Sequence, residues 1–233
     1  MHIPDGFINA PTSLAAGAVA AGGVGVSLRR AAQTLQERQA PLAGLVAAYI
    51  FAVQMLNFPV AAGTSGHLLG GVLAAVLVGP WAGCICVAVV LVVQSLVIAD
   101  GGLTALGLNI TNMAVVGVFG GWAIFRLLRR VLPATRTSVV AASGIAAGIS
   151  VVLAASAFVL EYALGGNGGA PVGTVLAAMV GVHTLIGVGE GIITALTVGV
   201  VLGVRPDLVY GAQDLQAPLR QETRPETAAR EVG

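Results

Sequence analysis

Long apolar runs separated by short polar breaks are the feature that most limits the folds open to this 233-residue chain. Hydrophobic residues make up 57% of it and charged residues only 9%, whereas a soluble domain has about 25% charged residues. Runs of about 20 apolar residues are long enough to span a bilayer. In lipid only helices and closed β-barrels satisfy their own backbone polar groups. Because the runs are continuous and do not alternate apolar with polar residues, we predict an all-α integral membrane protein.

The apolar runs predict a bundle of about seven transmembrane helices within residues 1–204. The segments expected to cross the membrane are 7–28, 42–59, 67–79, 81–99, 104–125, 137–160 and 172–204. At 1.5 Å per residue the last segment is too long for one upright helix, so we expect it to be strongly tilted or split near His183 to Glu190. Residues 205–233 are polar and mixed in charge, which predicts a disordered tail.

The basic residues predict the orientation of the bundle. All are arginines, and those up to residue 205 follow the first, fifth and seventh apolar segments: Arg29, Arg30, Arg38, Arg126, Arg129, Arg130, Arg136 and Arg205. The positive-inside rule then predicts an outside N-terminus and a cytoplasmic C-terminus. The acidic residues Asp5, Asp100 and Glu161 fall at the outer ends. The net charge of +1 gives no indication of a nucleic-acid partner.

The first residues, MHIPDGF, have the donors for a metal chelate. A free α-amine on Met1, the amide nitrogen of His2 and the His2 imidazole can close two fused rings on one ion. The start lacks the positive region of a secretory signal, so we expect it to be retained. Pro4, Asp5 and Gly6 favour a turn that folds these donors back over the helix ends, and Asp5 is a candidate to orient a ligand from outside the chelate.

A second candidate region is the polar break GTSGH that ends at His67. Irregular backbone at membrane depth is tolerated where it is buried in protein or lines a cavity, so we expect a pocket with His67 at its rim or floor. Four planar nitrogens, with His67 as the fourth donor, suit Ni(II) or Cu(II). The polar residues expected to line or support this pocket are Asn57, Thr64, Ser65 and Asn109.

His183 and Glu190 are ionisable residues inside the last apolar segment. They are seven residues apart and so share one helix face. Ionisable groups in a membrane usually face the bundle interior. The sequence leaves three alternatives open. The two residues pair with each other, they bridge to asparagine side chains, or they contact the metal-binding residues without binding the metal themselves.

The break also suggests an enzymatic alternative. The residues GTSG resemble the GxSG nucleophile loop of rhomboid intramembrane proteases, with Ser65 as nucleophile and His183 as base. The rhomboid histidine normally precedes a glycine three residues on, whereas Gly187 lies four residues after His183. This alternative also leaves the N-terminal MHIPDG and His67 without a role.

Several segments together resemble the CbiM/NikM family of substrate-capture components in energy-coupling-factor importers for cobalt or nickel. They are MHIPDGF, QMLNFPVAAGTSGHLLGG, GPWAG, DGGLTALGLNITNMAVVG and HTLIGVGEGIIT. The resemblance implies that Met1, His2 and His67 hold the metal ion. It also implies a bacterial or archaeal cytoplasmic membrane, a transmembrane T-component and two cytoplasmic ATPases as partners, and a small accessory membrane protein, which we expect to be a separate chain.

These features favour capture and transport of a metal over enzymatic catalysis by this chain. The sequences around the turn and His67 look more like the nickel branch, so we expect Ni(II) to be preferred over Co(II) as the transported substrate. The chain has no Walker A motif and no lysine, so bound ATP and ATP hydrolysis are expected only in partner subunits. An ungated channel is disfavoured because channels need sites that release ions quickly, and a four-nitrogen chelate releases its ion slowly.

Overall fold

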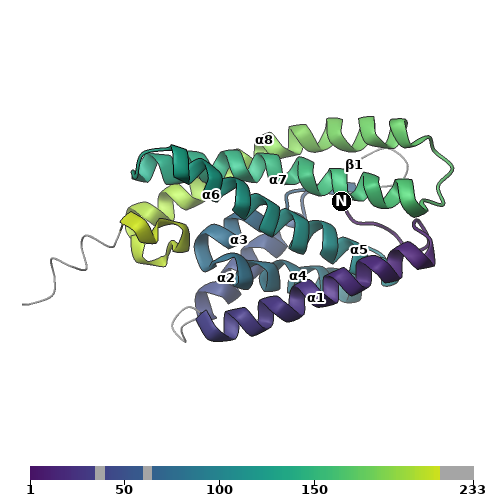
Figure 1. The fold of residues 1–233 in the computed structure, drawn as a ribbon, viewed down its shortest axis with the longest axis horizontal. Coiled ribbons are helices and arrows are strands. Elements are labelled where there is room, and N and C mark those ends of the chain that lie inside the picture. The colour runs from purple at the N-terminus through teal and green to yellow at the C-terminus, as the bar shows by residue number, and fades with distance from the viewer. Residues whose placement is uncertain (35–39, 60–64, 216–233) are drawn as a thin grey trace, which may run out of the picture.

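The computed structural model describes residues 1–34, 40–59 and 65–215 and is almost entirely helical, as predicted (Figure 1). Its longer elements are α1 (Ala10–Thr34), α2 (Ala40–Gln54), α3 (Gly71–Val78), α4 (Pro80–Val97), α5 (Leu106–Ile110), the π-helix η3 (Thr111–Gly120), α6 (Gly121–Val131), α7 (Arg136–Gly165) and α8 (Val172–Val204). A two-stranded antiparallel hairpin, β1 (Asn57–Pro59) and β2 (Ser65–His67), separates α2 from α3. In this hairpin Asn57 is paired with His67.

Within the described residues, five helical stretches are long and apolar enough to cross a membrane: α1, α4, the continuous stretch Leu106–Val131, α7 and α8. The α2 helix has 15 residues and α3 has eight, or about 22 Å and 12 Å of helix against a hydrocarbon core of about 30 Å. Each predicted apolar segment therefore contains a helix, but the predicted number of seven spans is not confirmed. The α2 segment is short because the chain leaves the helix after Gln54 and enters the hairpin.

The last apolar segment is one unbroken helix of 33 residues, so a split between His183 and Glu190 is excluded. It lies alongside α7 for much of its length (Figure 1). The two backbones approach closely where glycines face each other. A Cβ on Gly187 would come within 2.6 Å of the Gly148 carbonyl oxygen, and a Cβ on Gly144 within 2.8 Å of the Gly191 carbonyl oxygen. Small residues at these positions permit the tight helix contact that stabilises pairs in lipid.

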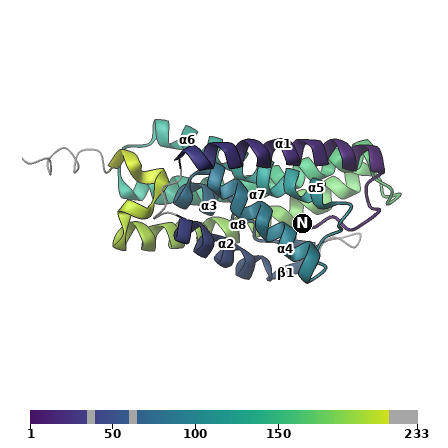
Figure 2. The ribbon, with the colours of Figure 1, turned by 90° about the horizontal axis from the view of Figure 1, so that it is seen from below.

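The short α3 helix lies at the centre of the bundle, and all eight of its residues are buried. It packs against α4, α7 and η3, and α4 in turn packs between α1 and α2 (Figure 2). The N-terminal segment, residues 1–9, runs into this bundle without forming a helix (Figure 1). The predicted turn is confirmed: Gly6 has φ +73°, and the Phe7 amide donates to the Pro4 carbonyl at 3.4 Å.

The start of the segment that we expected to be disordered is packed on the bundle. Two 3-10 turns, Pro206–Leu208 and Tyr210–Ala212, follow α8. Val209 is fully buried, and the Tyr210 ring lies 5.8 Å from the Trp122 ring, centroid to centroid. The expectation of disorder is therefore wrong for residues 205–215, because apolar and aromatic side chains among them find partners on α6. Residues 216–233 lie outside the described part of the chain.

Candidate metal centre

The α-amine of Met1 is buried inside the bundle. Met1 is 1% exposed, and this burial lowers the pKa of its amine from 8.0 to about 4, against the opposing influence of the Asp100 charge. An amine with this pKa is neutral near pH 7 and has its lone pair free. It therefore meets the requirement that a nitrogen ligand be deprotonated before it binds a metal ion.

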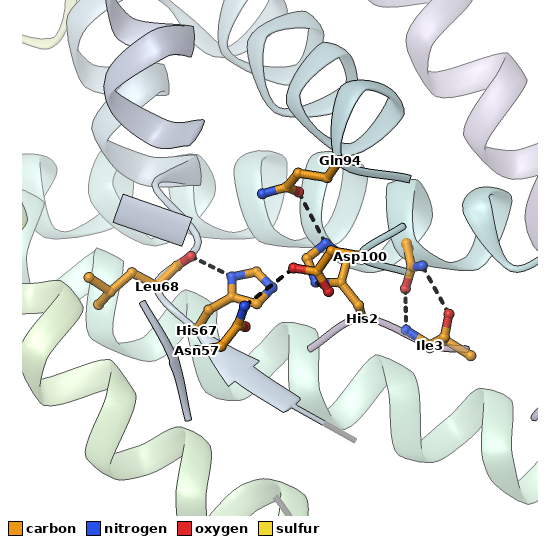
Figure 3. A network of polar contacts seen from close by, with 8 residues as sticks. His2, Ile3, Asn57, His67, Leu68, Gln94 and Asp100 are labelled. Atoms are coloured by element: carbon orange, nitrogen blue, oxygen red, sulfur yellow. Dashed lines mark hydrogen bonds and ion pairs between the residues drawn. The ribbon is translucent and has the colours of Figure 1, made fainter. Parts of the chain in front are cut away.

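The His2 imidazole lies between Gln94 of α4 and Asp100 of the following loop (Figure 3). Its Nε2 is 3.1 Å from the side-chain amide of Gln94. Its Nδ1 is 3.1 Å from Asp100 Oδ1 but is buried without an aligned hydrogen bond to any described residue. Nδ1 is the ring nitrogen that could close a second chelate ring with the His2 amide and the Met1 amine.

The His67 imidazole stacks on that of His2, with ring centroids 4.5 Å apart and an interplanar angle of 28°. Its Nδ1–H donates to the Leu68 carbonyl at 2.7 Å (Figure 3). Its Nε2 is buried and has no hydrogen-bond partner among the described residues. Burial first, then the charges of the amine and of His2, lower the pKa of His67 well below 6.5, so the ring is neutral and Nε2 is available to a metal ion.

The structure thus brings together the three residues predicted as metal ligands, Met1, His2 and His67. Within the described residues, no three His, Cys, Asp or Glu side chains lie close enough to hold a metal ion by themselves. A metal centre here would need nitrogens of the N-terminus and backbone in addition to the imidazoles. Their role as ligands remains a prediction.

Polar contacts tie the N-terminal segment to α5 and to the loop before it. The Ile3 amide donates to Asn109 Oδ1 at 2.8 Å, and the Ile3 carbonyl accepts from Asn109 Nδ2 at 3.3 Å and from the Gly102 amide at 2.9 Å. A Cβ on Gly102 would overlap the backbone nitrogen of Asp5, so only glycine allows this approach. Asn109, predicted to support the site, therefore holds the backbone that carries the chelating residues.

Asp5 anchors the turn through hydrogen bonds with Thr104. Its Oδ1 accepts hydrogen bonds from the Thr104 hydroxyl at 2.6 Å and the Thr104 amide at 2.7 Å. These bonds, the hydroxyl first, lower the pKa of the Asp5 carboxyl. Asp5 thus fixes the direction in which the chain enters the bundle.

Asp100 and Gln94 are site residues that the sequence analysis missed. The sequence places Asp100 only at an outer helix end, whereas in the structure it lies beside His2 and its second carboxylate oxygen accepts from Asn57 Nδ2 at 3.3 Å. The contact with His2, as the largest of several causes, lowers the pKa of Asp100. Asp100 therefore links the N-terminal segment to the hairpin that carries His67. For Gln94 a signal existed, because it is the lone amide in the apolar run VAVVLVVQSLVI and polar groups in spans are costly.

The remaining predicted residues differ in where they lie. Thr64 is outside the described residues, and for Ser65 only the backbone pairing with Pro59 is described. His183 is fully buried, and its Nδ1–H donates to the Met179 carbonyl of its own helix at 2.7 Å. Glu190 accepts hydrogen bonds from backbone amides just after His67. Of the alternatives left open above, pairing of His183 with Glu190 is therefore not observed.

Comparison with known proteins points in one direction. The family described as "Cobalt uptake substrate-specific transmembrane region" matches residues 2–208. A putative fused nickel transport protein, NikMN, of Archaeoglobus fulgidus is 41% identical over 209 residues, which cover 90% of this chain and 68% of that protein. The cobalt transport protein CbiM of Geobacter sulfurreducens is 34% identical over 94% of this chain and 64% of its own length.

The fold has a solved counterpart. The crystal structure of a truncated transition metal transporter superposes with a TM-score of 0.81 at 30% identity, covering 87% of this chain and 99% of that one. The rhomboid-type alternative based on Ser65 and His183 receives no support from these comparisons.

Proposed function

This chain belongs to the CbiM family of cobalt-uptake transmembrane regions, and from that premise we propose that it captures Ni(II) or Co(II) through Met1, His2 and His67. At the coarser level it is a membrane component of cobalt or nickel transport, related to proteins named for each metal. The proposed cargo is a substrate that passes through the protein. No covalent or redox chemistry is asked of this chain.

The observation that carries the proposal is a set of nitrogen donors gathered in one buried place. Burial lowers the pKa of the Met1 amine to about 4, the His2 ring stacks on the His67 ring, and His67 Nε2 has no hydrogen-bond partner among the described residues. Burying a polar atom without a partner costs free energy, so this site needs a compensating interaction. A divalent transition metal bound by nitrogen supplies it.

We propose that Ni(II) binds more tightly than Co(II). An amine, a backbone amide and two imidazoles form a four-nitrogen set of the kind that square-planar Ni(II) accepts. The similarity to a fused relative named for nickel supports tighter binding of Ni(II). The similarity to relatives named for cobalt makes Co(II) the competing substrate.

The proposed transport is inward and driven by ATP hydrolysis in partner subunits. The arginines at the end of α6 and after α8 favour a cytoplasmic C-terminal end in the cytoplasmic membrane, with the N-terminal segment outside. The partners proposed are a T-component, two ATPases and a small accessory membrane protein. The relative from Archaeoglobus fulgidus, named as a fused protein, extends beyond the aligned region and fits an accessory part carried in one chain there.

The test is competition binding of Ni(II) and Co(II) to the purified full chain, with His2→Ala and His67→Ala alongside. We expect each substitution to weaken Ni(II) binding by at least about 100-fold, equivalent to ~2.7 kcal/mol. Wild-type affinity in both variants would refute the ligand assignment. Tighter binding of Co(II) than of Ni(II) would refute the proposed selectivity and leave the ligands in place.

A further inference from the structure

Glu190 is a buried carboxyl group of α8 that the metal site as described does not use. It is 3% exposed and lies in a membrane-crossing helix. Its Oε2 accepts the Leu69 amide at 2.9 Å and its Oε1 accepts the Gly70 amide at 2.7 Å. Both oxygens are thus committed to the backbone two and three residues after His67.

The backbone that Glu190 holds is restrained from other sides as well. The Leu69 carbonyl accepts from Gln54 Nε2 of α2 at 2.7 Å, and the Gly70 carbonyl accepts from the Ala74 amide of α3 at 2.9 Å. Gly70 has φ +73°, and a Cβ there would lie 2.6 Å from Ile50 Cγ1. Three helices therefore determine where this short segment runs.

One peptide group connects Glu190 to His67. The Leu68 carbonyl and the Leu69 amide belong to the same planar unit, so the direction of one sets the direction of the other. The carbonyl accepts His67 Nδ1–H at 2.7 Å, and the amide donates to Glu190 Oε2 (Figure 3 shows the first contact). The result is a hydrogen-bonded chain from carboxyl group through peptide to imidazole.

Such a chain has two effects on the imidazole. It keeps the proton on Nδ1, so that Nε2 stays unprotonated, and it holds the ring plane in the orientation that stacks on His2. Hydrogen bonds in series also polarise one another, which increases the basicity of Nε2. Groups that orient a metal-binding histidine in this way commonly change metal affinity by about 10- to 100-fold when removed.

We propose that Glu190 is a positioning residue for His67, acting through the peptide group between Leu68 and Leu69. The inference rests on the proposed function, because it requires that His67 bind the metal ion. It connects α8 to one proposed metal ligand through two hydrogen bonds and the peptide group between them. A purely structural role for Glu190 would lack this dependence on His67.

The experiment is a double-mutant cycle on the purified full chain, read out by Ni(II) affinity and by the ligand-field absorption of the Ni(II) complex. The variants are Glu190→Gln, His67→Ala and the double substitution. Glutamine has nearly the volume of glutamate but offers one acceptor where the backbone presents two donors. Glu161→Gln is the matched control, because Glu161 is also buried but accepts from Asn112 Nδ2.

We expect Glu190→Gln to weaken Ni(II) binding by about 10- to 100-fold and to shift the absorption spectrum toward that of His67→Ala. Added to His67→Ala it should cause no further loss, and Glu161→Gln should bind as wild type. Glu190→Asp, which sets the carboxyl group one methylene too short, takes the place of the glutamine variant if the latter does not fold, with the same expected loss.

Wild-type affinity and spectrum in Glu190→Gln would overturn the proposal, and so would an equal loss in the presence and absence of His67. Failure of the proposed function is distinguishable, because it appears in His67→Ala alone as unchanged metal binding.

Discussion

The two ends of the bundle differ in how deeply they bury polar and charged groups. At the end that holds the N-terminal segment, Met1, His2 and His67 are buried, and His67 Nε2 has no hydrogen-bond partner among the described residues. At the arginine-rich end, Arg129 pairs with Asp214 at 2.5 Å and Arg205 with Asp207 at 2.8 Å, and both aspartates are about half exposed.

The difference shows where a substitution should matter. In an exposed ion pair, each charge exchanges a favourable interaction with water for a similarly favourable one with its partner. The pair therefore adds little to the free energy of unfolding. A buried nitrogen without a partner carries a desolvation cost that only a suitable ligand offsets. Function should therefore be sensitive at one end and tolerant at the other, and four changes of decreasing effect test this contrast.

The largest effect is expected from adding Gly-Ser before Met1. The added residues convert the amine into an amide and do not fit where Met1 is 1% exposed. We expect Ni(II) affinity to fall by at least about 1,000-fold, or ~4.1 kcal/mol, in competition binding. Unchanged affinity in the extended protein would show that the amine is not a ligand.

Acidification should loosen the N-terminal segment. An undocked amine is protonated below pH 8.0, whereas the docked amine stays neutral down to about pH 4. The stability contributed by docking is therefore complete above pH 8 and is lost as the pH falls toward 4, by up to about 1.4 kcal/mol per unit. Thermal unfolding of the metal-free protein at pH 8 and pH 6 measures this loss. The extended protein is the control, and an equal response in both would contradict the assignment.

Asp100→Asn should have a smaller effect. The substitution keeps the volume and removes the carboxylate charge 3.1 Å from His2 Nδ1. We expect Ni(II) affinity to fall by about tenfold, because Asp100 orients the imidazole without replacing it as a ligand. A loss as large as that of His2→Ala would instead make Asp100 a ligand, and no loss would remove it from the site.

The smallest effect is expected at the other end, from Asp214→Asn. This substitution removes the ion pair with Arg129, in which the Asp214 side chain is 54% exposed and the Arg129 side chain 9% exposed. Arg129 keeps its hydrogen bond to the Pro133 carbonyl, so the free energy of unfolding should fall by about 1 to 2 kcal/mol, and Ni(II) affinity should stay at the wild-type value. A drop in metal affinity would show that the two ends are coupled and that the contrast drawn above is too simple.

Much of the fold could be predicted, because the backbone polar groups of a continuous apolar run in lipid must bond within the run, and a helix allows this. The number of spans could not, because α2 and α3 are apolar segments whose lengths are set by the hairpin between them. Packing of residues 205–215 was also missed: their composition is polar, but Val209 and Tyr210 contact side chains from distant helices.

The candidate site also has features that could be predicted from the sequence and features that could not. Met1 and His2 could be proposed as ligands because a chelate of amine, amide and imidazole needs only adjacent residues, and His67 because it ends a polar break between apolar runs. The contact of His2 with Gln94 joins residues 92 positions apart, and that of Glu190 with Leu69 joins residues 121 apart. Contacts over such separations depend on how helices pack, and no local pattern encodes them.

The sequence by itself determined that this chain is a helical membrane protein with nitrogen donors at its very start and in one polar break. Only the tertiary structure decided that the amine is buried, that the His2 and His67 rings stack, that Asp100 contacts His2, and that Glu190 binds the backbone next to His67. The reason is that protonation and orientation depend on burial and on hydrogen-bond partners, and both are properties of the packed bundle.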